Sequence, residues 1–218
     1  MSNFKFKYMH INKCAGSSFY MWMHQNNIAP FGGSKGDHKI ESIFLPEITN
    51  ITTVRNPYDR MKSVYNQWKN SGWLKDIHLS DAGTSKPFTF SEFVKLLPEC
   101  YENNNSNTLI KDTYLGQWGH LKDFESPVGI RFIKPCSYWM KYIDKFKIFY
   151  FENLEEINSF FTNKGFHIKN GISNVIDGKT TTERKKSYIE YYTKNEIKII
   201  NDLFHDDFVN FNYEKVKL

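Results

Sequence analysis

The sequence of 218 residues lacks most features of disulfide scaffolds, metal centres and membrane proteins. Its three cysteines, Cys14, Cys100 and Cys136, are odd in number and form no C-x-x-C pair, which argues against a disulfide framework and a thiolate zinc site. The histidines form no H-x-x-x-H pair and have no tight acidic cluster beside them, so no metal is expected. No run approaches the ~18 apolar residues of a membrane span, and the N-terminus lacks the apolar core of a signal peptide. These absences predict a cytoplasmic protein without a membrane span.

Arginine is also scarce, since only four of the 29 basic residues are arginines. They are Arg55, Arg60, Arg131 and Arg184. A guanidinium group binds phosphate in a bidentate manner, so the positions at which a lysine-rich chain uses arginine indicate candidate phosphate sites. The net charge of +5 favours anionic partners in general. The chain nevertheless has no run of about five or more like charges, as nucleic-acid-binding tails have, so no nucleic acid is expected as a partner.

The pattern of apolar residues predicts an α/β fold. Strands are expected at residues 4–11, 51–54 and 147–151, and helices are expected to follow them from Ser17, Pro57 and Leu154. Alternating strands and helices predict a single domain, residues 1–218, with a mostly parallel central sheet flanked by helices. In such sheets ligands bind at the carboxyl ends of the strands.

The remaining segments are less regular. Helices are expected around 91–97 and 113–121 and at a last apolar stripe formed by Ile197, Ile200, Leu203 and Phe204, whereas 72–87 and 171–186 are expected to be loops. The segment from about 72 to 130 is the part that the sequence determines least. On the helix from Pro57, the buried stripe is expected to consist of Tyr58, Met61, Val64, Tyr65 and Trp68, with Arg60, Ser63 and Gln67 on a different face.

The first strand-to-helix corner has the composition of an anion site. Residues 13–18, Lys-Cys-Ala-Gly-Ser-Ser, bring a lysine, two hydroxyls and successive backbone N–H groups to the start of a helix that Gly16 or Ser17 is expected to cap. It is not a Walker A loop, because Lys13 precedes Gly16 instead of following the glycines. Taken alone, the string also fits an ordinary serine-capped helix after a glycine turn.

The second corner is a candidate for a second phosphate site. Arg55 stands at the end of the second strand, and Ser63 stands on the helix that follows. The alternative is structural: Arg60 would pair with Asp59 or Asp37, and Ser63 would be an ordinary surface residue.

The two corners together resemble the sulfotransferases that use 3′-phosphoadenosine-5′-phosphosulfate (PAPS), especially the carbohydrate branch with the heparan sulfate 2-O-sulfotransferases. Residues 10–18 are similar to that family's H-I-P-K-[TC]-[AG]-G-[TS]-S loop for the 5′-phosphosulfate, with Asn12 in place of proline. Residues 55–66 are similar to its R-[DN]-P-Y-[DE]-R-x-x-S-x-Y-N element for the 3′-phosphate. Shorter similarities occur at 135–138, at 151–154 (F-E-N-L), at 179–185 and at 207–213.

The resemblance implies a metal-independent, in-line transfer of a sulfuryl group from PAPS to an acceptor hydroxyl, expected to belong to a saccharide. It implies a P-loop-like loop for the phosphosulfate, Lys13 as the residue that stabilises the departing oxygen, and His38 as the catalytic base, with His120 in reserve. The implied cofactor-binding residues are Lys13, Cys14, Ala15, Gly16, Ser17 and Ser18 in the loop, Arg55 and Ser63 for the 3′-phosphate, and Lys179 and Thr180 in a closing loop. For Cys14 a structural role is expected instead of a nucleophilic one, because the family accepts Thr or Cys there.

Two other functions compete with this hypothesis. A P-loop-type nucleotide kinase would require a Mg²⁺ site and a preference for ATP, and the position of Lys13 argues against it. A non-catalytic module that binds anions or glycans would use the same basic residues without a cofactor, and its affinity would fall steeply with salt.

Overall fold

The computed structural model describes residues 3–31, 47–78, 85–103, 109, 128–140, 143–177 and 187–218. The chain forms two compact units, and neither is continuous in sequence. Unit 1 consists of residues 1–56 and 136–186, and unit 2 consists of residues 57–135 and 187–218. The count of one domain stays a prediction, and each unit is described by itself.

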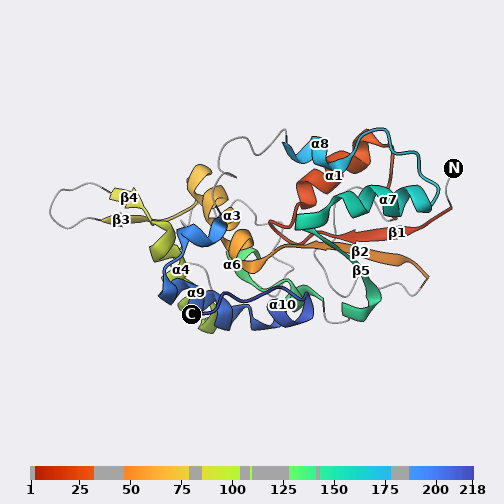
Figure 1. The fold of residues 1–218 in the computed structure, drawn as a ribbon. Helices are drawn as coiled ribbons and strands as arrows, with labels where there is room; N and C mark the ends of the chain where they lie inside the picture. Colours follow the sequence, from red (N-terminus) through yellow and green to blue (C-terminus); the bar gives the residue numbers. More distant parts are fainter. Residues whose placement is uncertain are drawn as a thin grey trace. The chain divides into compact units, whose positions relative to one another are not determined.

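Unit 1 is an α/β structure with a small parallel sheet flanked by helices (Figure 1). Its elements are β1 (Phe6–Met9), α1 (Gly16–Gln25), β2 (Thr49–Val54), η2 (Ser137–Trp139), η3 (Ile143–Lys145), β5 (Phe146–Tyr150), η4 (Phe151–Asn153), α7 (Glu155–Asn163) and α8 (Ile172–Asp177), where η denotes a short 3-10 helix. The strand order is β1-β2-β5, and both pairings are parallel. The fold class expected from the sequence is therefore confirmed at this level.

One face of the sheet carries the core of unit 1. Phe6, Ile51 and Phe149 project from the three strands and pack against apolar residues of α1, α7 and α8, which lie on the same side of the sheet in Figure 1. The helix residues that complete this core are Phe19, Trp22, Met23, Ile157, Phe161, Ile172 and Val175. The helix α7 ends at Asn163, and Gly165 just beyond it has φ 84°, the left-handed conformation that commonly ends helices.

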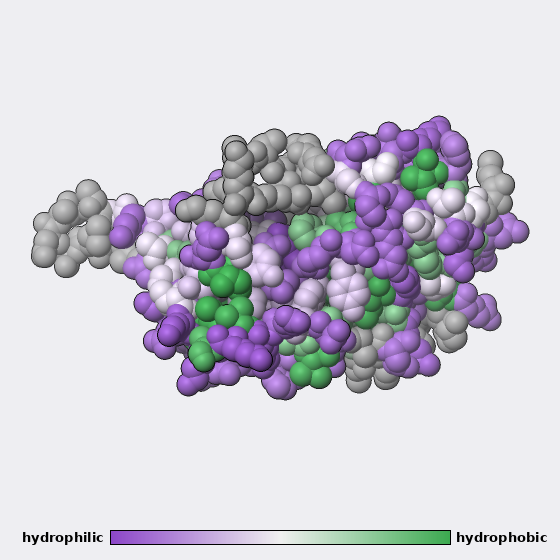
Figure 2. Space-filling view, in the orientation of Figure 1, coloured by the Kyte–Doolittle hydropathy of each residue, from purple (hydrophilic) through white to green (hydrophobic). Residues whose placement is uncertain are grey.

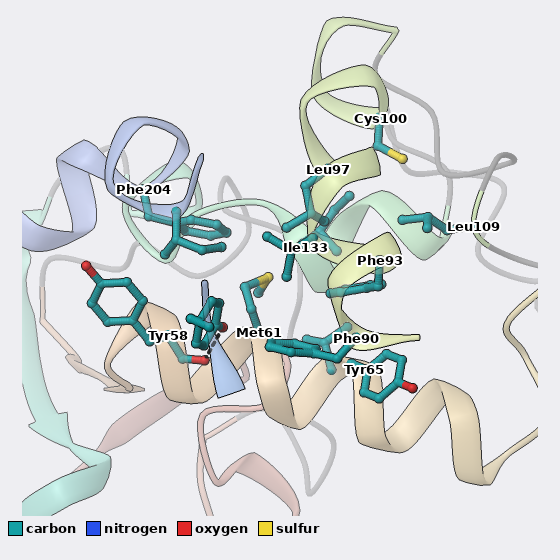
Figure 3. Packing of buried hydrophobic residues seen from close by; sticks show 14 of the residues in the cluster. Tyr58, Met61, Tyr65, Phe90, Phe93, Leu97, Cys100, Leu109, Ile133 and Phe204 are labelled. Atoms are coloured by element: carbon teal, nitrogen blue, oxygen red, sulfur yellow. Dashed lines mark hydrogen bonds between the residues drawn. The ribbon is translucent and has the colours of Figure 1, made fainter. Parts of the chain in front are cut away.

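Unit 2 is mainly helical. Its elements are α3 (Pro57–Asn70), β3 (Asp76–His78), β4 (Ser85–Pro87), α4 (Phe90–Glu102), α6 (Val128–Ile133), η5 (Tyr188–Tyr191), α9 (Lys194–Leu203) and α10 (His205–Asn210). The start of α3 at Pro57 and the buried stripe along it agree with the sequence pattern. Figure 3 shows Met61 and Tyr65 of α3 beside Phe90 and Phe93 of α4 in the aromatic core of this unit.

Arg60 was expected on a face of α3 other than the apolar stripe, and its side chain is fully buried there. Its Nη1 and Nη2 atoms donate to the carbonyl oxygens of Lys134 and Phe132, at 2.7 and 2.9 Å. The guanidinium thus satisfies carbonyls at the C-terminal end of α6, where a cation also complements the helix dipole. Arg60 is therefore a structural residue of unit 2, held by backbone carbonyls.

Two segments that were expected to be loops contain regular structure. The strands β3 and β4 pair antiparallel within residues 72–87, and α8 lies within residues 171–186, against α1 and α7. Tertiary packing explains α8, because Ile172 and Val175 are buried in the core of unit 1 while its sequence is otherwise polar. The helix expected at 113–121 lies outside the described residues.

The face of the molecule seen in Figure 2 is mostly polar where its residues are described. On the face seen in Figure 2, hydrophobic residues occur in small groups between hydrophilic ones. The large hydrophobic side chains that are exposed are Met21, Phe31, Tyr138, Val209 and Leu218. Within the described residues, no helix combines the length and apolar character needed to cross a membrane.

Candidate functional site

The three parallel strands end at one edge of the sheet in unit 1, and the segments that follow them form the candidate site. The register pairs Met9 with Thr52 and Val54 with Tyr150, so the chain leaves neighbouring strands close together. The segments that meet there are residues 10–15, residues 55–56 and η4. This is the carboxyl edge at which parallel sheets bind ligands.

The loop between β1 and α1 has an unusual backbone. Lys13 and Ala15 have φ angles of 65° and 66°, in the left-handed region that disfavours residues with a Cβ atom. The other non-glycine residues with positive φ in the described part of the chain are Asn27 and Asn212, and asparagine tolerates this conformation. Uncommon backbone strain is therefore concentrated in the loop that the sequence singled out.

The start of α1 also differs from the prediction. The residue that precedes the first helical turn is Ala15, and no side chain caps the helix, so neither Gly16 nor Ser17 has the expected role. The amide of Phe19 donates to the carbonyl of Ala15, 2.9 Å away, as the first bond of the helix. The amides of the first turn, Gly16 to Ser18, precede this bond and stand at the positive end of the helix dipole.

Gly16 is required by the packing of His10. A Cβ atom added to Gly16 would lie 1.8 Å from Cδ2 and 2.0 Å from Nε2 of the His10 ring. The imidazole therefore covers the Cα atom of the first helical residue. Two tyrosine rings contact the imidazole. The Tyr8 ring is stacked on it with 6.3 Å between the ring centres, and the Tyr20 ring packs edge-on with 5.9 Å between the centres.

A buried hydrogen-bond chain fixes the loop to the sheet. The hydroxyl of Thr53 donates to the carbonyl of Cys14. Because the single hydroxyl proton of Thr53 is used there, the Tyr8 hydroxyl, 2.7 Å away, must donate to Thr53. Burial raises the pKa of Tyr8 well above its ordinary value, which keeps this donor protonated.

Cys14 is held inside the unit. Its thiol is fully buried and lies 3.6 Å from the equally buried thiol of Cys136. The amide of Cys14 donates to the carbonyl of Ile11 at 3.2 Å and closes a turn within the loop. These contacts suit the structural role expected for Cys14, because a nucleophile must be reached by its substrate.

Arg55 connects two corners of the site. Its Nη1 atom donates to the carbonyl of Lys13 at 3.3 Å. Its Cζ atom lies 3.9 Å from the centre of the ring of Phe151, which is the first residue of η4. The next residue, Asn56, donates its backbone N–H to Oε1 of Glu152 at 2.9 Å. The three segments of the carboxyl edge are therefore linked by specific contacts.

The structure brings together some of the predicted site residues. Those at the carboxyl edge of unit 1 are Lys13, Cys14, Ala15, Gly16, Ser17, Ser18 and Arg55. Ser63 lies on α3 in unit 2, where it is partly buried. The predicted residues His38, Lys179 and Thr180, together with the reserve base His120, lie outside the described residues.

Three residues of the site had no role assigned to them from the sequence, although two of them lie in the F-E-N-L segment at 151–154. They are Thr53, Phe151 and Glu152, which hold the loop, Arg55 and Asn56 respectively. The signal that locates the last two is strand register: with Val54 beside Tyr150, the residues that follow must also be neighbours. A sequence predicts strands more readily than it predicts which residues pair between them.

The chain matches no protein-family model, no curated protein and no solved structure. Within the described residues, no group of three or more His, Cys, Asp or Glu side chains is arranged to hold a metal ion.

Proposed function

We propose that this chain is a sulfotransferase that moves the sulfuryl group of PAPS to an acceptor hydroxyl on a saccharide. The observation that carries the proposal is the hydrogen bond from Arg55 to the carbonyl of Lys13. The residues at its two ends belong to the two motifs that resemble the 5′-phosphosulfate and 3′-phosphate elements of that family. A nucleotide with an anionic group at each end requires two such elements close together.

The loop backbone supports a P-loop-like role. Cys14 has a negative φ between the positive φ angles of Lys13 and Ala15. Alternating left- and right-handed residues turn successive N–H groups toward one side, which makes a concave site for an anion. The proposed donors are the backbone amides from Ala15 to Ser18, with the hydroxyls of Ser17 and Ser18, at the positive end of α1.

The proposed transfer is an in-line displacement. The acceptor oxygen attacks sulfur while the bond from sulfur to the bridging phosphate oxygen breaks, and the 3′,5′-bisphosphate nucleotide (PAP) leaves with the electron pair. Lys13 stabilises the charge that develops on that oxygen. Preorganised donors at such a position contribute on the order of 3–4 kcal/mol each in favourable cases.

The family resemblance assigns further roles. His38 is assigned as the base that accepts the proton of the acceptor hydroxyl, and Lys179 and Thr180 are assigned to nucleotide binding. Arg55 and Ser63 are each assigned to the 3′-phosphate, a group that AMP and ATP lack, so recognition of this group would determine which nucleotide binds. These assignments depend on the family resemblance alone.

Calorimetry tests the nucleotide part of the proposal directly. The wild-type chain is expected to bind PAP about tenfold or more tightly than 5′-AMP, because only PAP offers a 3′-phosphate to the Arg55 guanidinium. Arg55→Ala should reduce PAP affinity to that of AMP. The matched control is Lys145→Ala, since Lys145 is an exposed cation of the same unit immediately before the start of β5, at the opposite edge of the sheet.

Several outcomes contradict the proposal. Equal wild-type affinity for PAP and AMP refutes the 3′-phosphate site, and a requirement for ATP with Mg²⁺ indicates a kinase instead. Affinity that is lost equally in both variants and falls steeply with salt indicates a general anion-binding module. If PAP binds but radiolabelled PAPS transfers no sulfuryl group to any member of a saccharide panel, the acceptor class is wrong.

A further inference from the structure

The guanidinium of Arg55 is held from two sides by unit 1 itself. From one side the carbonyl of Lys13 accepts a hydrogen bond from Nη1. From the other side the aromatic ring of Phe151 lies 3.9 Å from Cζ, well within the range of a cation–π contact. A long, flexible cation at a strand end is thereby confined to one orientation.

Strand register explains why Phe151 occupies this position. The ladder between β2 and β5 ends at the pair Val54 and Tyr150, and the next residue on each strand is Arg55 on one and Phe151 on the other. A lateral neighbour in a parallel sheet lies about 4.8 Å away, so the two side chains meet beyond the last ladder pair.

A second contact fixes the backbone that carries Arg55. The carboxylate of Glu152 accepts the N–H of Asn56, the residue after Arg55. The adjacent residues Phe151 and Glu152 in η4 thus hold the side chain of one residue and the backbone of the next. Hydrogen bonds in which one partner is ionised are shorter and stronger than neutral ones, so this anchor resists rotation of the chain at Arg55.

We infer that Phe151 is a positioning residue that gives the site its preference for a 3′-phosphorylated nucleotide. The inference rests on the proposed function, because Arg55 is the residue that would bind the 3′-phosphate. Bidentate binding of a phosphate requires the guanidinium plane to be set in advance, since its donors form a rigid fork. A guanidinium presents five N–H donors, so one group can bind both a carbonyl and a phosphate. The ring of Phe151 sets that plane.

The test compares Phe151→Leu, which removes the π-face, with Phe151→Tyr, which keeps it. Calorimetry with PAP and with 5′-AMP measures the preference for the 3′-phosphate in each variant. We expect Phe151→Leu to reduce PAP affinity about tenfold with little change for AMP, and Phe151→Tyr to retain the wild-type ratio. The matched control is Phe166→Leu, because Phe166 is another partly buried ring packed against the same core, where it contacts Phe4 and Phe161.

The outcomes separate this inference from the proposed function. A wild-type chain without preference for PAP overturns both. A wild-type preference that survives in Phe151→Leu overturns the inference alone, as does an equal loss of affinity for PAP and AMP. A loss of preference in Phe166→Leu of the same size also overturns it, because general loosening of the core would then explain the effect.

Discussion

At the scale of single residues, the lack of a Cβ atom at the first residue of α1 makes room for a neighbouring aromatic ring. Gly16 has space for a hydrogen only, because the imidazole of His10 covers its Cα atom. The sequence showed a glycine in a loop typical of anion sites but not the reason for it. The reason is a contact between two residues six positions apart, which becomes visible only when the loop is closed.

Gly16→Ala is therefore expected to destabilise the fold by about 1–3 kcal/mol, the usual cost of overpacking, as measured by urea denaturation. The control is Gly171→Ala, where the nearest atom to an added Cβ is Nδ2 of Asn158 at an ordinary 3.4 Å.

Removing the ring should relieve the clash, so His10→Ala combined with Gly16→Ala should be more stable than the sum of the two single changes predicts. Strict additivity, or a Gly16→Ala variant as stable as Gly171→Ala, would show that His10 does not determine the packing at this position.

At the scale of secondary-structure elements, those with a clear apolar sequence pattern could be predicted, whereas those that depend on tertiary contacts could not. The strand β1 and the helix α3 follow from the periodicity of their apolar residues, whereas β2 and β5 follow from short runs of β-branched or aromatic residues. The hairpin of β3 and β4 lacks that signal, because its second strand, Ser-Lys-Pro, is fully exposed. The short helix α6 depends on a distant residue, Arg60, for its C-terminal hydrogen bonds.

Arg60→Met tests this dependence, because methionine fills much of the same space but donates no hydrogen bond. The variant leaves the carbonyls of Phe132 and Lys134 without their charged donor, and we expect a loss of about 3 kcal/mol in unfolding free energy. Lys198→Met, at an exposed position of α9 in the same unit, is the control and should change stability by less than about 0.5 kcal/mol. A similar small effect at both positions would contradict the capping role of Arg60.

At the scale of the whole molecule, both units bury tyrosine hydroxyls. Burial is the main cause that raises the pKa of Tyr8 in unit 1 and the pKa values of Tyr58, Tyr65 and Tyr192 in unit 2. In the unfolded chain a tyrosine loses its proton near pH ~10. Above that pH the unfolded state binds fewer protons than the folded state, so stability falls as the pH rises.

The expected result is a stability that is maintained below pH ~10 and declines above it, by up to about 1.4 kcal/mol per pH unit for each fully buried tyrosine. Urea denaturation across the alkaline range measures this decline. Tyr8→Phe should make it shallower, at the cost of about 1 kcal/mol near neutral pH for the lost hydrogen bond to Thr53. An unchanged slope in Tyr8→Phe would mean that this phenol titrates alike in both states.

The division into two units was not anticipated from the sequence. The predicted strands and ligand-binding edge all lie in unit 1, whereas Ser63 belongs to unit 2 although it is only eight positions from Arg55. Spacing along a helix predicts the face on which a residue lies, but not the compact unit into which that helix packs. Of the two residues predicted to bind the 3′-phosphate, Arg55 therefore has contacts at the carboxyl edge, whereas Ser63 lies on α3 in the other unit.

The hydrogen bonds that assemble the carboxyl edge span long stretches of chain: Thr53 to Cys14, Arg55 to Lys13 and Asn56 to Glu152 are separated by 39, 42 and 96 positions. Closing such loops costs entropy before any contact is gained, and contacts of this range slow folding. A ribosome-bound chain that has not yet emerged as far as Glu152 cannot contain the finished edge. Formation of these three hydrogen bonds therefore reports that the ends of β1, β2 and β5 have come together, an event that a refolding experiment can time.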